Sequence, residues 1–169
     1  ILEKLLVLQD RDRQITRLGE ELAALPPQRA AAQARREAAR QAVEAARQHG
    51  LHLEAERKKL ELEVETRQQQ IEKYSLQQFQ TKRNEEYRAL AHEIETCKAE
   101  ILRLEDQQLG LMEQQEQTQQ QLARLRQQFD EVRRETERVL ADLTAREQNL
   151  QQQLKELSAG RAALAAEVE

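Results

Sequence analysis

Tryptophan is absent from this 169-residue chain, and two tyrosines and two phenylalanines are its only aromatic residues. A globular core of this length normally draws on more aromatic and fewer charged residues, so the 34% charged content argues against one. Four glycines and two prolines leave few positions at which a helix would stop. The apolar residues recur with helical spacing, which disordered chains lack, so the composition favours long exposed helices.

Cysteine is also scarce, and the single Cys97 excludes an intrachain disulfide and a four-cysteine metal site within these residues. Charge interrupts every hydrophobic stretch, so we expect neither a membrane span nor a signal peptide, and a cytoplasmic location. The net charge of −4 combines 27 basic with 31 acidic residues, which argues against general attraction to nucleic acid.

Catalytic motifs are lacking as well. The sequence contains no glycine-rich phosphate loop and no recognisable pair of nucleophile and base. His49, His52 and His92 have no accompanying ligand set that suits a metal. We therefore predict that the chain is not an enzyme and holds no metal or cofactor of its own.

A coiled-coil seam occupies the second half of the chain. From Tyr87 to Leu143, positions spaced alternately three and four apart are apolar at 13 of 17 sites, the polar ones being Gln108, Gln115, Thr118 and Thr136. Towards the N-terminus, a similar stripe is widened by Leu2, Leu6 and Val7, which predicts an additional neighbour and favours a homodimer through this apolar face.

The pattern predicts an all-α fold, a long antiparallel two-helix coiled-coil hairpin with a Pro-Pro break near its N-terminus. Proline lacks the N–H that a helix needs, so Pro26-Pro27 separates a helix over residues 1–25 from an outgoing helix over 26–80. The tip is expected at 81–84 and the return helix at 85–169, with Thr81 or Asn84 as its cap. Facing residues should then have numbers that add to about 164, which pairs Gln115 with His49.

Two groups of residues are candidates for binding. Aromatic and basic residues gather at the tip, either to plug the open end of the coil or to dock a protein partner: Tyr74, Phe79, Lys82, Arg83, Asn84, Tyr87 and Arg88. Further along, an arginine cluster forms either a solvated face or a site for nucleic acid or an acidic partner: Arg29, Arg35, Arg36, Arg40, Arg47, Arg124, Arg126, Arg133 and Arg134.

The run from Lys82 to Glu95, KRNEEYRALAHEIE, resembles the motif K-T-N-K-E-Y-x-A-L-x-x-E-I-E of a bacterial family. Its members carry an N-terminal coiled-coil hairpin and a C-terminal four-cysteine zinc ribbon. Leu8-Gln9-Asp10, Leu25-Pro26 and Leu104-Glu105-Asp106 also match. The resemblance implies a zinc-binding ribbon after Glu169, nucleic-acid binding, and a role like that of relatives that regulate flagella or secretion and bind the sigma factor of nitrogen limitation.

Three hypotheses follow. The first is a non-enzymatic adaptor or regulator that presents its tip and helix surfaces to protein partners, among them a sigma factor or secretion and flagellar components. The second is binding of RNA or DNA by the arginine cluster together with the zinc ribbon. The third is a purely structural, dimerising rod.

Overall fold

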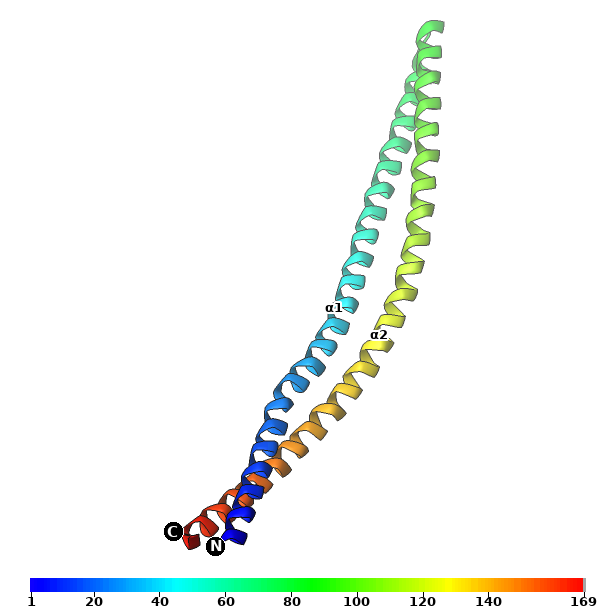
Figure 1. The fold of residues 1–169 in the computed structure, drawn as a ribbon. Coiled ribbons are helices and arrows are strands. Elements are labelled where there is room, and N and C mark those ends of the chain that lie inside the picture. Colours follow the sequence, from blue (N-terminus) through cyan, green and yellow to red (C-terminus); the bar gives the residue numbers. More distant parts are fainter. Residues whose placement is uncertain (169) are drawn as a thin grey trace. The chain divides into compact units, whose positions relative to one another are not determined.

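A computed structural model describes residues 1–168 as two long α-helices with no strand among them. Helix α1 spans Leu2–Gln80 and α2 spans Asn84–Val168, with a three-residue turn between them. The helices pack against each other as a hairpin (Figure 1), which confirms the predicted fold class. Helix α2 begins at Asn84, one residue before the expected start.

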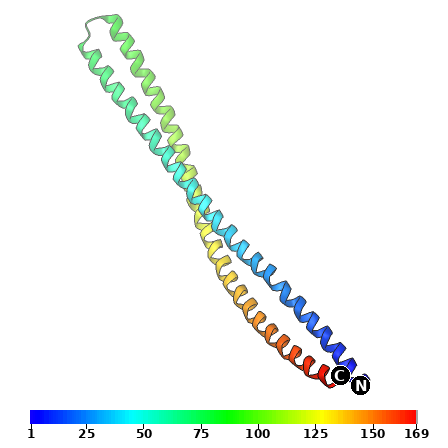
Figure 2. The ribbon, with the colours of Figure 1, turned by 90° about the vertical axis from the view of Figure 1, so that its left-hand side faces the viewer.

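The chain divides into two units, each built from both helices. The base unit comprises Ile1–Gln41 and the described residues from Gln127 onward, and the tip unit comprises Ala42–Arg126. In the base unit, the start of α1 lies beside the end of α2, where Lys4 Nζ is 3.4 Å from Glu167 Oε2. In the tip unit, the turn joins the two helices, as Figure 2 shows.

The expected break at Pro26-Pro27 is wrong, because α1 continues through both prolines. Each proline removes one hydrogen bond to the carbonyl four residues earlier, in Leu22 and Ala23. Both prolines and Ala23 are exposed, so water can reach this side of the helix. Leu25 immediately before them is 2% exposed and packs in the core of the base unit. This packing stabilises the helical conformation of α1 at the prolines.

The predicted seam is the buried face of α2. Its positions from Leu90 to Leu143 are all buried or half-buried, and Tyr87, the first position of the predicted seam, is 49% exposed. The core of the base unit consists of Leu25, Leu143 and Leu150, packed against Leu18, Leu22 and Val139. In the tip unit the buried apolar residues are Leu53, Ile94, Cys97 and Leu104.

The register differs from the expected one by about one helical turn. In the base unit Thr136 Oγ1 is 3.5 Å from the carbonyl oxygen of Ala32, and in the tip unit a Cβ on Gly50 would lie 3.7 Å from Thr118 Cγ2. Both pairs have numbers that add to 168 rather than 164. Gln115 consequently does not face His49, and its Oε1 accepts a 3.3 Å hydrogen bond from Arg57.

Candidate interaction surfaces

The turn at 81–83 is held by its own hydrogen bonds. The Thr81 hydroxyl accepts from the Arg83 N–H at 3.4 Å and donates to Glu86 Oε2 at 2.8 Å. The Arg83 carbonyl accepts the first bond of α2, from the Tyr87 N–H at 3.1 Å. Arg83 therefore stands at the N-cap position, where Thr81 or Asn84 was expected. No described residue outside glycine has a positive φ, so the turn needs no glycine.

The aromatic residues near the tip have different roles. Tyr74 is half-buried in the seam of α1 and fills space between the helices. Phe79 is 89% exposed and does not plug the coil, while Tyr87 is 49% exposed. Leu76, which the sequence analysis missed, is 59% exposed and stands three residues before Phe79, on the same face of α1. We call Leu76 and Phe79 the tip patch.

Basic residues follow the tip patch in the sequence. Arg83 Nη1 lies 3.7 Å from Glu86 Oε1, which neutralises part of its charge. Lys82 and Arg88 are exposed and form no ion pair with the described residues. Asn84 is exposed at the first position of α2. The predicted tip residues therefore lie close together, and all except Tyr74 face solvent.

The arginine cluster is divided between the two units. Arg29, Arg35, Arg36, Arg40, Arg133 and Arg134 belong to the base unit, and Arg47, Arg124 and Arg126 belong to the tip unit. The nine residues that the sequence predicts as one patch thus form two groups.

Most arginines of the base unit already have carboxylate partners. Arg29 Nη2 is 2.9 Å from Glu147 Oε2 across the helices, and Arg40 Nη2 is 2.6 Å from Glu37 Oε1. Arg35 lies 4.0 Å from Glu135, while Arg133 is within 4 Å of Asp130 and Glu137. Arg36 is half-buried in the seam, and Arg134 is exposed without an ion pair to the described residues. This arrangement favours a solvated charged face.

In the tip unit, Arg47 Nη2 is 2.7 Å from Glu44 Oε1, whereas Arg124 and Arg126 are exposed and have no ion pair to the described residues. The hydrogen bonds that Arg47 donates to Glu44 raise the pKa of Arg47. Likewise, the hydrogen bond from Arg40 is the main cause that lowers the pKa of Glu37. Carboxylates thus pair with Arg47 and with Arg40 of the base unit, whereas Arg124 and Arg126 have no such partner among the described residues.

The N-terminal turns of α1 expose a wide apolar face, as the sequence predicted. Ile1 is 90% exposed, Leu2 74% and Leu6 58%. Leu5 and Val7 are also exposed, although the end of α2 lies beside this part of the base unit. The additional neighbour that the sequence predicts is not supplied by α2.

Features for catalysis or metal binding are sparse in the described part of the chain. No group of three or more His, Cys, Asp or Glu residues there is placed to hold a metal ion. Cys97 is buried, and its Sγ lies 3.6 Å from Gln70 Oε1. None of the described helices has a segment long and apolar enough to cross a membrane. Within residues 1–168, the hollows beside Gly50 and beside Gly160 are open grooves along the helices.

Comparison with known proteins places this hairpin in a family. The family model of the CT398-like coiled coil hairpin domain matches residues 8–169. The chain belongs to this family. A solved structure of CT398 from Chlamydia trachomatis has a TM-score of 0.87 to the chain, with 23% sequence identity, over 98% of this chain and 70% of that one. At this identity the likeness shows the shared fold. Among curated proteins, no significant match was found.

Proposed function

We propose that this member of the CT398-like family is a non-enzymatic adaptor whose hairpin tip binds other proteins. The exposure of the tip patch carries the proposal, since Phe79 and Leu76 stand in water while Tyr74 already fills the seam nearby. Exposed aromatic residues beside basic ones are typical anchors of protein interfaces. A self-supporting turn presents the patch in a fixed conformation, which lowers the entropy cost of binding.

The tip motif resembles that of the bacterial family with a zinc ribbon, and this resemblance indicates particular partners. A sigma factor or components of a secretion or flagellar apparatus are the partners that we expect. A zinc ribbon is expected to accompany the hairpin in the whole protein. These two expectations are independent of the tip patch, and each is testable by itself.

Site-specific crosslinking tests the adaptor role. A photoreactive amino acid replaces Phe79 in one version of the protein and Leu62, which is 64% exposed in the same unit, in another. In the native cell, Phe79 should capture a defined protein that Leu62 does not capture. In a version with the photoreactive group at Lys82, Leu76→Ser and Phe79→Ala should abolish this capture while the helix content stays unchanged. Equal capture from Leu62, or capture that survives both substitutions, would contradict the proposal.

A second candidate function, dimerisation, is favoured by the N-terminal apolar face. Ile1, Leu2 and Leu6 would be removed from water between two copies. Each Å² of apolar surface buried in this way stabilises the dimer by roughly 25 cal/mol. Sedimentation equilibrium should show a dimer that becomes monomeric in the Leu2→Ser/Leu6→Ser variant. A monomer mass for both proteins would remove this candidate.

A further inference from the structure

Three large apolar residues of α2 lie outside the seam of the tip unit. Leu102 is 64% exposed, Leu109 60% and Met112 45%. Leu109 follows Leu102 by seven residues and Met112 follows Leu109 by three, so all three fall on one stripe of the helix. Each stands one position after a seam residue, so the stripe runs along one side of the hairpin.

A groove continues this stripe. Its volume is about 400 Å³, and both helices line it: Arg47, Gly50, Leu51, Glu54 and Arg57 on α1, and Gln115, Thr118, Gln119 and Leu122 on α2. The two arginines are paired with Glu44 and Glu61 of α1. The missing side chain of Gly50 leaves part of this space open. Gln119 follows Met112 by seven residues and therefore lies on the same stripe. Leu51, which is 48% exposed, adds an apolar wall.

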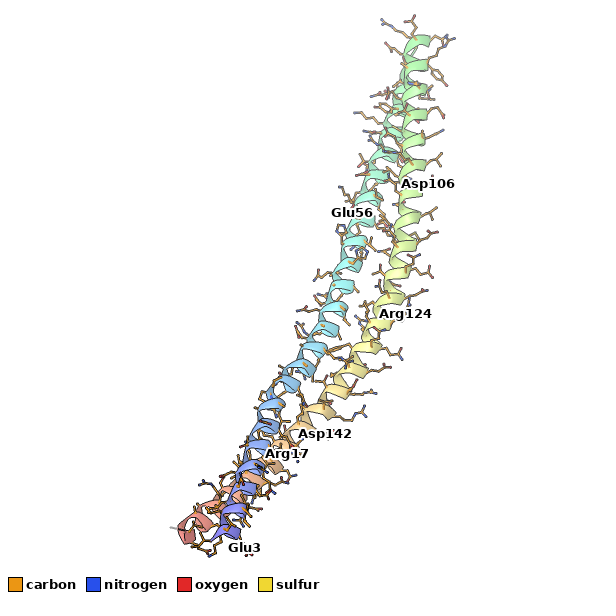
Figure 3. The ribbon with its side chains drawn as sticks, in the orientation of Figure 1. Glu3, Arg17, Glu56, Asp106, Arg124 and Asp142 are labelled. Atoms are coloured by element: carbon orange, nitrogen blue, oxygen red, sulfur yellow. The ribbon has the colours of Figure 1, made fainter. Side chains whose placement is uncertain are left out.

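Carboxylates surround the apolar stripe. Between residues 102 and 116, α2 carries Glu105, Asp106, Glu113 and Glu116 against one basic residue, Arg103. Glu105 and Glu116 lie on the stripe, and Asp106, labelled in Figure 3, and Glu113 lie along its outer edge. None of the four forms an ion pair with another described residue. The stretch of α2 from Leu102 to Glu116 therefore repels polyanions and attracts cationic groups.

We infer that this side of the tip unit binds an amphipathic helix of a partner protein, with a leucine-type apolar face bordered by lysine and arginine. A third helix laid along two others buries its apolar stripe against both, as in helical bundles. From Leu102 to Leu122 the surface is about 30 Å long at 1.5 Å per residue, which suits a partner helix of about 20 residues. Its basic residues would pair with the four carboxylates.

This inference rests on the protein-binding role proposed above, but it concerns a surface separate from the tip patch. Loss of crosslinking at Phe79 would leave it standing, and its own failure would leave the tip patch standing. Nucleic acid is not the occupant that the charges favour, because phosphates would meet Glu105 and Glu116.

Binding of a designed peptide tests the inference on the whole chain. The probe is a helix of about 20 residues with leucines at heptad spacing bordered by lysines. Its controls are a scrambled peptide of the same composition and one with glutamate in place of lysine. Fluorescence anisotropy should show saturable binding of the probe and much weaker binding of both controls. Equal binding of the scrambled peptide would reduce the effect to charge attraction and overturn the inference.

Substitutions locate the binding. Leu102→Gln/Leu109→Gln should weaken binding about tenfold or more, as expected for anchors of an interface. Leu62→Gln is the matched control, because Leu62 and Leu102 are each 64% exposed, and it should leave the affinity unchanged. Glu105→Gln/Glu116→Gln should flatten the salt dependence. An equal loss from Leu62→Gln would overturn the inference. The inference would also fail if the free chain self-associated and Leu109→Gln abolished that self-association, because the surface would then bind a second copy of the chain.

Discussion

Two of the polar residues in the seam, Gln115 and Thr136, form hydrogen bonds with α1. The Thr136 hydroxyl, 3% exposed, donates to the Ala32 carbonyl, and Gln115 accepts from Arg57. Among the described residues, no buried side-chain nitrogen or oxygen lacks a hydrogen bond. Because an unpaired buried polar group costs free energy, these bonds let a polar seam remain folded.

At Gly50, the close approach of Thr118 permits a side chain of one carbon. A new Cβ would meet Thr118 Cγ2 at 3.7 Å, an ordinary contact, and alanine is the better helix former by about 1 kcal/mol. Gly50→Ala should therefore raise the free energy of unfolding in urea by about that amount. Gly110→Ala, which meets nothing within 4 Å, serves as the control and should show the propensity gain alone. A loss at Gly50 would mean tighter packing than the structure shows.

Lowering the pH should weaken the ion pair between Glu37 and Arg40. The Arg40 hydrogen bond lowers the pKa of Glu37 below its ordinary 4.5, so its contribution is present above that value and is lost as pH falls through the folded-state pKa. Arg40→Ala should raise the pKa of Glu37 towards 4.5, as measured by NMR titration. Gln41→Ala, which removes a smaller contribution, should raise it less. An unchanged titration in both variants would contradict this cause.

The main feature at the scale of the element is the continuity of α1. Its 79 residues include two adjacent prolines that local preference alone would place at a boundary. Tertiary packing outweighs that preference, because Leu25 beside the prolines is buried against Leu143 and Leu150. Helical stability in proteins comes largely from such packing rather than from propensity.

Replacing the prolines tests this continuity. Pro26→Ala and Pro27→Ala should each restore a backbone hydrogen bond and raise the free energy of unfolding, by up to about 3 kcal/mol. Gln28→Ala, at an exposed position of the same helix, should change it by no more than about 0.5 kcal/mol. If thermal unfolding showed no gain, or a loss, at either proline, the chain would turn there rather than continue as helix.

At the scale of the whole molecule, the essential feature is that the two halves of one chain pair with each other in a fixed register. Ala32 with Thr136 and Gly50 with Thr118 define it in the two units separately. Every surface described above depends on this pairing, since pairing between two extended copies would remove the turn that presents Phe79.

Engineered disulfides test both the pairing and its register. In a Cys97→Ala background, Ala32→Cys/Thr136→Cys should oxidise readily and remain at monomer mass on a nonreducing gel. The control pair is Ala32→Cys/Val132→Cys, which matches the register expected from the sequence. It should oxidise slowly, because a disulfide requires Cα atoms within about 7 Å. Crosslinked dimers would show intermolecular pairing, and faster closure of the control would restore the earlier register.

Periodicity was sufficient to find the seam, because burial on a helix repeats with the spacing of the sequence itself. The positions from Leu90 to Leu143 were named in this way, and so was the turn near Thr81. The residue type of Phe79 did not determine whether its side chain is buried or exposed. Its exposure depends on the direction in which α1 approaches the turn, a geometric property that no local pattern encodes.

The sequence by itself determined which face of each helix is apolar, and hence that α2 buries Ile94 and Leu104 while it carries Glu105 outside. The tertiary structure alone decided the register, the path of α1 through Pro26-Pro27 and the side on which Leu102, Leu109 and Met112 remain uncovered. The physical reason is that an α-helix repeats about every 3.6 residues. A slip of one turn presents the same apolar face to its partner, so only the contacts between particular side chains distinguish one register from the next.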